Sequence, residues 1–328
     1  MLMFIAKRLL MVIPTLLAVS LIAFLILQLP PGDFLDSYIA QLQAQGEIVD
    51  EKSITDLRER YGLDQPFIVQ YWNWISGIIL RGDFGMSFEW KRPVSELIWE
   101  RLAFSAALSF VALLITWVIA FPIGVYSALH KYTLGDYVLN VIGLFGIATP
   151  SFLVALVLMY FAFAQLGMSV GGLFSPEYAD APWSWRKLGD LLAHAWIPLI
   201  VIATNGTASL IRILRANLLD ELNKPYVVTA RARGTAESHL TLKYPVRVAL
   251  NPFVSTLGWV LVSIVSGEAI ISIVLNLPTT GPLLLQALKA QDMYLAASFI
   301  LMLSVLTVIG TLISDILLAW LDPRIRYA

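Results

Sequence analysis

The feature that most restricts the fold of this chain is a set of long stretches without charged side chains. The stretch from 102 to 129 contains no Asp, Glu, Lys or Arg, and it exceeds the roughly 20 residues that a helix needs to cross the hydrocarbon core of a bilayer. Only 14% of all residues are charged, whereas soluble domains average about 25%. Because lipid offers the backbone no hydrogen-bond partners, runs of this length are expected to be helical. The sequence therefore predicts an all-α, polytopic membrane protein.

Stretches of this kind predict six transmembrane helices. The expected spans are residues 9–29, 102–129, 137–167, 195–211, 253–277 and 293–321. The first span follows Lys7 and Arg8, as the apolar core of a signal peptide would. It is longer than such a core, however, and it does not end at a small-residue cleavage site. We therefore expect it to be retained as the first helix.

Three positions within the expected spans are candidates for a break or a kink. Pro150 lies in the third span, and Pro198 and Gly206 lie in the fourth. A proline inside a helix lacks the N–H that would continue the hydrogen bonding and clashes with the preceding turn. Such kinks act either as hinges or as static packing features, and the sequence leaves both interpretations open.

The distribution of Lys and Arg over the loops indicates the orientation, because short cytoplasmic loops carry an excess of these residues. In a six-span arrangement both termini lie on one side, and the basic residues of the loops gather on that same side. They are Lys7, Arg8, Lys131, Arg212, Arg215, Lys224, Arg231, Arg233, Lys243, Arg247, Arg324 and Arg326. This side is therefore expected to be cytoplasmic.

The chain is expected to divide into three parts. Residues 1–30 form the first transmembrane helix, residues 31–100 an outer, periplasmic segment, and residues 101–328 a five-helix core with a cytoplasmic loop at about 216–247. In the outer segment, apolar residues recur at helical spacing, which predicts an interfacial helix on the rim of the bundle. These residues are Phe67, Tyr71, Trp74 and Ile78. Direct contact with a substrate is the alternative role for this helix.

Tryptophans mark two outer segments. Trp72 and Trp74 are expected at the membrane interface, where amphipathic rings are common. Trp183 and Trp185 lie in a second outer loop, 176–190, which is a candidate contact for an external partner. Because aromatic residues near the interface are ordinary, neither pair identifies a substrate site.

Several classes of chemistry are excluded or disfavoured by the motifs. The sequence contains no G-x-x-x-x-G-K-[ST] stretch, so it offers no P-loop for ATP. The three histidines, His130, His194 and His239, are not arranged as in the zinc motif HExxH. Cysteine is absent, which excludes disulfides and thiol catalysis, and a net charge of −1 gives no indication of nucleic-acid binding. We expect no catalytic residue, cofactor or metal site in this chain.

Few ionisable residues lie within the expected spans. Glu268 is in the fifth span and Asp315 is near the end of the sixth. Intramembrane ionisable residues commonly mark a transport pathway, so Glu268 is a candidate pathway or gating residue. The alternative is that it faces a water-filled cavity for structural reasons. An ion-coupled secondary carrier usually has several such groups and inverted repeats. That class of protein is therefore the alternative, and the chain is expected to draw its energy from elsewhere.

The most informative segment is the expected cytoplasmic loop around Pro225. Asn223 is a suitable N-cap, Pro225 fits a first helical turn, and Gly234 can supply a left-handed stop. These residues predict a helix of about ten residues, roughly 15 Å long. Small residues would let another protein approach the helix closely, and Arg231 and Arg233 would add charged contacts. The alternative is an ordinary basic loop that only obeys the positive-inside rule.

This segment resembles the cytoplasmic "EAA" loop of ABC importer permeases, in the form Y-V-x-T-A-R-A-[KR]-G typical of the dipeptide/oligopeptide/nickel family. The residues at matching positions are Tyr226, Thr229, Ala230, Arg231, Ala232 and Gly234. The resemblance implies a short coupling helix that docks into a groove on an ATPase subunit. Two positions depart from the pattern, since Pro225 stands where the family usually has Asp and Val228 where the wider motif has Glu.

The resemblance covers nearly the whole chain, because further motifs of the family follow in the family's order. They lie at residues 8–15, 31–33, 61–66, 82–87, 93–94, 150–152, 267–281 and 321–326. The segment at 267–281, which contains Glu268, matches less closely than the others. Each motif alone is a weak indication, whereas their common order and spacing are specific.

The resemblance implies a type I importer in the bacterial inner membrane. Two permease subunits would form the pathway, with a paralogue favoured over a second copy of this chain. Two ABC ATPase subunits would bind ATP and Mg²⁺, and a periplasmic binding protein would deliver the substrate. Di- or oligopeptides are the favoured substrates, and oligosaccharides, opines and nickel chelates are the alternatives. The sequence identifies no residue that contacts the substrate.

Overall fold

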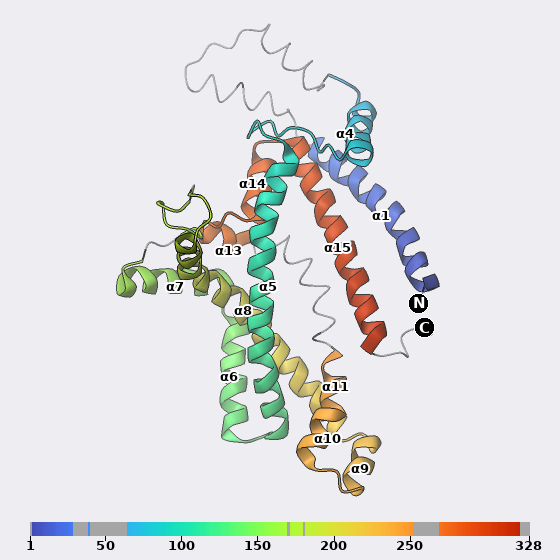
Figure 1. Ribbon diagram of the computed structural model, residues 1–328, viewed down its shortest axis with the longest axis vertical. Coiled ribbons are helices and arrows are strands. Elements are labelled where there is room, and N and C mark those ends of the chain that lie inside the picture. Colours follow the sequence, from blue (N-terminus) through green and yellow to red (C-terminus); the bar gives the residue numbers. More distant parts are fainter. Residues whose placement is uncertain are drawn as a thin grey trace. The chain divides into compact units, whose positions relative to one another are not determined.

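The computed structural model describes residues 2–28, 39, 64–168, 171–179, 181–251, 253 and 269–321, and these residues are predominantly helical. Within these ranges there is no β-strand, and one isolated β-bridge joins Met86 and Pro93. The all-α expectation is thereby confirmed for the described residues. Their helices are α1 (Leu2–Gln28), α4 (Phe67–Arg81), α5 (Val94–Leu129), α6 (Leu134–Ala148), α7 (Ser151–Leu166), α8 (Trp185–Leu222), α9 (Pro225–Ala232), α10 (Glu237–Lys243), α11 (Pro245–Ala249), α13 (Ala269–Val274), α14 (Thr280–Lys289) and α15 (Met293–Leu321) (Figure 1).

Three of the described helices, α5, α8 and α15, are long and apolar enough to cross a membrane, and the pair α6–α7 is a fourth if it counts as one span. The described part of α1 contains a shorter apolar helix, Leu10–Ile26. Most of the expected span 253–277, Glu268 included, lies outside the described residues. The number of six spans therefore stays a prediction.

Helix α8 is longer than the span predicted from the sequence. The expected span covered 195–211, whereas α8 runs for 38 residues from Trp185 to Leu222. Charged side chains near both ends suggested that the helix stops early, but Lys187 and Arg215 are accommodated by specific partners. Pro198 and Gly206 lie inside the continuous helix, so neither residue ends it.

The break in the third expected span is confirmed. Helices α6 and α7 meet at an angle of 99°, with Thr149 in an extended conformation between them (φ −86°, ψ 123°). Pro150 explains this conformation, because proline disfavours the helical region for the residue before it. A hinge at this bend stays a prediction.

By its contacts, the chain forms two compact units, one of residues 1–104 and 279–308 and the other of residues 105–278 and 309–328. In the first unit, the predicted helix at 67–81 is confirmed as α4, and its apolar face is packed inside. Trp74 is only 3% exposed, stacks on Phe24 of α1, and donates from Nε1 to Ser298 Oγ at 3.0 Å. Trp72 is 66% exposed. Of the two tryptophans expected at an interface, only Trp72 therefore faces outward from this unit.

In the second unit, a core joins α5, α8 and α11. Leu214 and Leu218 of α8 are fully buried there. At Gly124 of α5, a Cβ atom would lie 2.8 Å from Leu214 Cδ2, so the two helices approach each other more closely than any larger residue allows. The core fixes the end of α8 from which the following short helices extend.

The expected outer loop at 176–190 closes over the start of α8. Ser184 caps this helix by accepting a hydrogen bond from the Lys187 backbone N–H at 3.2 Å. The Lys187 ammonium donates to Ala181 O at 2.6 Å and lies 5.4 Å from the centroid of the Trp183 ring. Trp183 and Trp185 remain largely exposed. A contact of this loop with an external partner stays a prediction.

Candidate functional site

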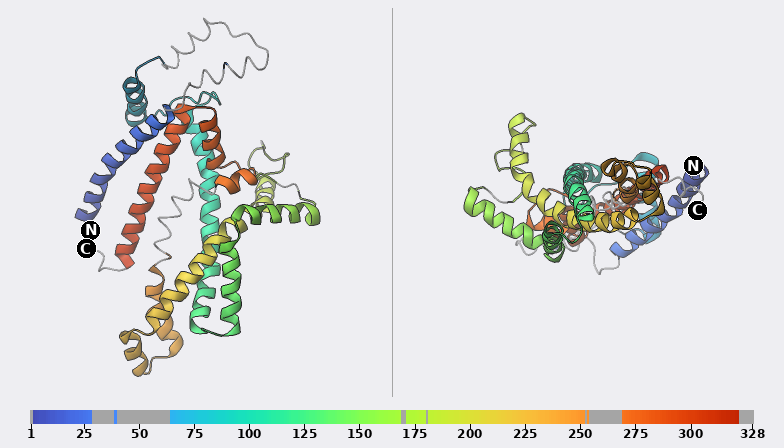
Figure 2. Two further views of the ribbon diagram at one scale, coloured as in Figure 1. Left: turned by 180° about the vertical axis from the view of Figure 1, so that it is seen from behind. Right: turned by 90° about the horizontal axis from the view of Figure 1, so that it is seen from below.

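The candidate site is the segment that follows α8, in which α9, α10 and α11 lie close together (Figure 2). Helix α9 has eight residues, with Pro225 in its first turn as predicted. The predicted N-cap at Asn223 is wrong, because Lys224 precedes the helix while Asn223 ends α8. The Asn223 side chain donates from Nδ2 to Leu219 O at 3.0 Å, so it completes the last turn of α8.

Gly234 forms the left-handed turn after α9, as predicted. Its φ is +77°, and its backbone N–H donates to Arg231 O at 3.0 Å. A Cβ atom at this position would meet nothing within 4 Å. The glycine is therefore favoured by its backbone conformation, and the space beside it is open to a partner.

Helix α9 is anchored by a single side chain and presents the rest outward. Val227 is fully buried, and so is Leu240 of α10. Of the six residues that match the family motif, Ala230 is half-buried and the others are exposed: Tyr226, Thr229, Arg231, Ala232 and Gly234. A surface of small residues with one aromatic ring is suited to close approach by another protein.

An ion pair and a side-chain hydrogen bond hold this segment in shape. Arg231 binds the Glu237 carboxylate with two hydrogen bonds, one of them from Nε to Oε2 at 3.0 Å. This pairing lowers the pKa of Glu237 and raises that of Arg231. The Tyr226 hydroxyl donates to Glu221 Oε2, and burial together with this carboxylate raises the pKa of Tyr226.

The pairing distinguishes the two arginines of this segment. Arg231 and Arg233 were both expected to contact a partner, but Arg231 is engaged across the turn between α9 and α10. Arg233 is exposed, and no ionic partner is seen for it among the described residues. Of these two arginines, Arg233 is therefore the one whose charge is left available to a partner of α9.

The sequence did not indicate a buried ion pair between α6 and α8. Asp136 is 2% exposed and binds Arg215 through two hydrogen bonds, Nε to Oδ1 at 2.8 Å and Nη2 to Oδ2 at 2.7 Å. It also accepts hydrogen bonds from Asn140 Nδ2 at 2.6 Å, the Tyr132 backbone N–H at 2.9 Å and the Ser127 hydroxyl. The sequence held one indication of this pair: Asp136 lies just before the expected span 137–167, and Arg215 lies just after the expected span 195–211.

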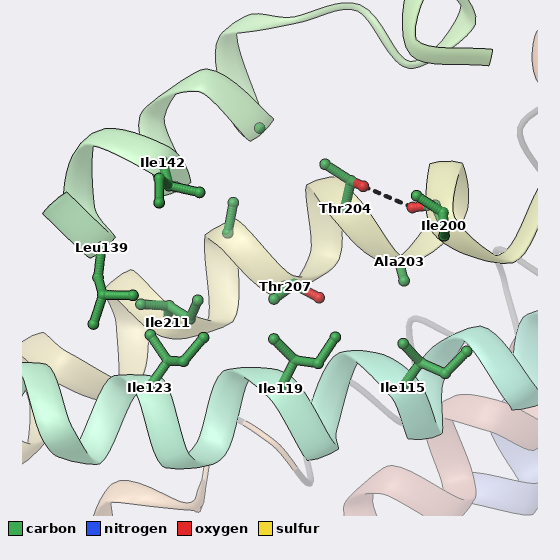
Figure 3. A pocket seen from close by; sticks show the side chains of 13 residues that line it. Ile115, Ile119, Ile123, Leu139, Ile142, Ile200, Ala203, Thr204, Thr207 and Ile211 are labelled. Atoms are coloured by element: carbon green, nitrogen blue, oxygen red, sulfur yellow. Dashed lines mark hydrogen bonds between the residues drawn. The ribbon is translucent and has the colours of Figure 1, made fainter. Parts of the chain in front are cut away.

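A mostly apolar cavity of about 230 Å³ lies between α5, α6 and α8. Figure 3 shows Ile115, Ile119 and Ile123 of α5 along one wall, with Thr207 of α8 facing them. The Thr207 hydroxyl has no hydrogen-bond partner among the described residues. Within the same ranges, no group of three or more His, Cys, Asp or Glu residues is placed to hold a metal ion.

Comparisons with known proteins agree with the motifs of the chain. Residues 120–327 match the family described as "Binding-protein-dependent transport system inner membrane component", and residues 1–109 match the N-terminal component of the same transport systems. The oligopeptide transport system permease protein AppB of Bacillus subtilis (strain 168) is 34% identical over 99% of both chains. A putative peptide permease protein of Brucella ovis is 33% identical over 99% of both chains. The glutathione transport system permease protein GsiC of Salmonella choleraesuis is 32% identical over the full length of both chains.

Proposed function

The chain belongs to the family of binding-protein-dependent inner-membrane transport components, the permease subunits of ABC importers, and on this premise we propose that it imports di- or oligopeptides. Subunits of this family do not themselves hydrolyse ATP. The peptide assignment is supported by the relatives, which are an oligopeptide permease, a putative peptide permease and a permease for glutathione. Glutathione is itself a short peptide, so one substrate class accounts for all three.

The proposed topology has six spans in the inner membrane with both termini in the cytoplasm. The spans supported by described helices are α5, the bent pair α6–α7, α8 and α15, together with the apolar part of α1. The segment after α8 carries Lys224, Arg231, Arg233, Lys243 and Arg247. Because short cytoplasmic loops are rich in such residues, α9 to α11 are proposed to face the cytoplasm.

The observation that carries the mechanism is the exposed surface of α9. Val227 is the fully buried side chain of this helix, while Tyr226, Val228 and Arg233 remain exposed. We propose that this surface docks on one of two ABC ATPase subunits, which bind ATP and Mg²⁺. A second permease, favoured as a paralogue, completes the pathway, and a periplasmic binding protein delivers the substrate.

The first experiment is affinity purification of the chain from mild detergent, with mass spectrometry of the proteins that accompany it. We expect an ATPase with a Walker motif and a second permease of different sequence. Recovery of a second copy of this chain in place of a paralogue would make the permease pair a homodimer. A preparation that lacks any ATPase in several mild detergents would contradict the proposed docking.

The substrate class is tested by uptake in cells that lack the gene. Labelled di- and tripeptides, glutathione, an oligosaccharide and a nickel chelate are compared in cells with and without the restored chain. We expect restored uptake of peptides only, and excess unlabelled peptide should compete with it. Restored uptake of the oligosaccharide or the chelate without peptide uptake would replace the peptide assignment.

A further inference from the structure

The ion pair between Asp136 and Arg215 joins α6 to the part of α8 that precedes α9, all within the second unit. Arg215 is on the same uninterrupted helix as Leu222, the last residue of α8, which α9 follows after two residues. Seven residues of helix correspond to about 10 Å, and Leu214 and Leu218 pack this part of α8 firmly. A displacement of α9 therefore also moves Arg215.

The geometry of the pair makes it a stiff connection. Both nitrogens of Arg215 that face Asp136 bind a separate carboxylate oxygen, and such planar two-point contacts fix orientation as well as distance. The Asp136 carboxylate also accepts hydrogen bonds from the Ser127 hydroxyl, the Tyr132 backbone N–H and the Asn140 side-chain amide. The end of α5, the turn after it and the start of α6 are thereby held to α8 at one point.

Helices α6 and α8 meet again near the far end of α6. A Cβ atom at Gly146 would lie 3.3 Å from Ala208 Cβ and 3.3 Å from Thr204 Cγ2, so the two helices are close together here. Between this contact and the ion pair lies the mostly apolar cavity, lined on α6 by Leu139, Ile142 and Gly143 (Figure 3). The two helices are thus in contact on both sides of the cavity, at the ion pair and at Gly146.

Beyond Gly146, α6 ends at Ala148, and the chain turns by 99° into α7. If α6 moves, the bend at Thr149 and Pro150 therefore moves with it. We propose that Asp136 and Arg215 are positioning residues for transport, which make α6 follow α8 so that displacement of α9 reaches the α6–α7 bend. This inference rests on the proposed role of α9 as the site of ATPase docking.

The first test neutralises the pair without changing its shape, by Asp136→Asn combined with Arg215→Gln. The complex should still assemble with its ATPase and hydrolyse ATP at the basal rate. Stimulation of hydrolysis by the loaded binding protein, and uptake of peptide, should both fall by about tenfold or more, the usual size of a coupling between distant sites. Uptake at the wild-type level in this variant would overturn the inference.

The control is another ion pair of the same chain, Arg92–Glu96, which joins Nη2 and Oε2 at 3.5 Å with both side chains about half exposed. Neutralising it by Arg92→Gln and Glu96→Gln should leave uptake and stimulation unchanged. An equal loss in the control would mean that any lost charge pair impairs uptake, which would also overturn the specific role of Asp136 and Arg215.

The second test uses a covalent link and takes advantage of the absence of native cysteine. The Cβ separation of 3.3 Å at Gly146 and Ala208 is close to the separation of about 3.5–4.5 Å that a disulfide requires. In Gly146→Cys/Ala208→Cys, oxidation should leave uptake at the level of the reduced form, because α6 and α8 move together. Loss of uptake on oxidation, with recovery on reduction, would show that the helices must separate and would overturn the inference.

The same disulfide shows whether the ion pair positions α6 against α8 or only stabilises the fold. When it is added to the neutralised pair, oxidation should restore the stimulated hydrolysis and the uptake, since α6 is again fastened to α8. A formed disulfide without recovery would overturn the inference. If the neutralised variant fails to assemble, the oxidation experiment on the native pair decides alone.

Failure of the proposed docking would be recognised separately. In that case variants of α9 would retain the ATPase in the purified complex. The ion-pair variants are judged by stimulation and uptake in complexes that already contain the ATPase.

Discussion

Arg231 and Glu237 form a two-point ion pair across the left-handed turn at Gly234. The pair joins the last turn of α9 to the first turn of α10, so it fixes the angle at which α9 is presented. Val227 and Leu240 add a buried anchor on each of these helices. The orientation of the proposed docking surface is thus set by this chain before any partner binds.

Glu237→Gln should loosen this orientation, because the amide offers Arg231 one acceptor oxygen in place of two and carries no negative charge. We expect less ATPase in the purified complex, measured by quantitative mass spectrometry. Arg233→Gln should also lower ATPase recovery, but by removing a direct contact.

The pKa of Glu237 lies below its ordinary value of 4.5, so the pair contributes above that value and is lost only as the pH falls through the lowered pKa.

The difference in ATPase recovery between the wild type and Glu237→Gln should therefore stay constant from about pH 8 to about pH 5. Glu89, an exposed acid of the other unit, supplies the control variant Glu89→Gln. A difference that disappears already near neutral pH would contradict the assignment of the pair.

Gly234→Trp should separate membrane insertion from coupling. The turn needs a positive φ, which costs a non-glycine residue about 1–2 kcal/mol, but no atom of this chain lies within 4 Å of the added Cβ. We expect normal insertion, loss of the ATPase and loss of uptake. Gly234→Asn should be milder, because Asn tolerates this conformation. Normal uptake by Gly234→Trp would argue against α9 as the docking helix.

The length and apolar character of the helices could be predicted from the sequence, because lipid leaves the backbone no alternative. The break at Pro150 was equally predictable from the restriction that proline imposes on Thr149. The extent of α8 was not, because a charged residue such as Arg215 indicates the end of a span unless its partner is known. That partner, Asp136, is 79 residues away in the chain.

In the candidate site, too, local features could be predicted from the sequence and contacts between separate helices could not. The turn at Gly234 and the short helix after Pro225 follow from local backbone preferences, so the sequence predicted them. The pairing of Arg231 with Glu237 depends on how α10 folds back beside α9, and no local pattern determines that. The contact of Arg231 with a partner protein stays a prediction.

Gly124→Ala should destabilise the second unit. The new Cβ would lie 2.8 Å from Leu214 Cδ2, and Leu214 is fully buried, so the side chain has little room to move. Overpacking of this kind costs about 1–3 kcal/mol. Gly143→Ala is the matched control, because its Cβ would meet nothing within 4 Å.

Thermal unfolding in detergent, followed by size-exclusion fluorescence, should show a lower transition temperature for Gly124→Ala and no change for Gly143→Ala. Adding Leu214→Ala to Gly124→Ala removes the contact at 2.8 Å and leaves the Leu214 Cβ at 3.1 Å, so the two changes together should cost less than the sum of their separate effects. Strict additivity would mean that the two residues are not in contact.

Asp292→Ala should weaken the start of α15 together with the loop that binds there. The carboxylate of Asp292 is fully buried, accepts the Ser87 hydroxyl at 2.5 Å and caps α15 through the Leu295 N–H at 3.1 Å. Loss of a cap costs about 1 kcal/mol, and the buried donors left without an acceptor add about 1–3 kcal/mol. Thermal unfolding should show the loss, with Glu89→Ala as the control, because the Glu89 side chain is exposed. The Ser87 hydroxyl also accepts the Trp90 backbone N–H at 3.1 Å, so in the Asp292→Ala background Ser87→Ala should cost less than it does alone, but more than nothing. A full additional loss from Ser87→Ala would show that the two residues stabilise the protein independently.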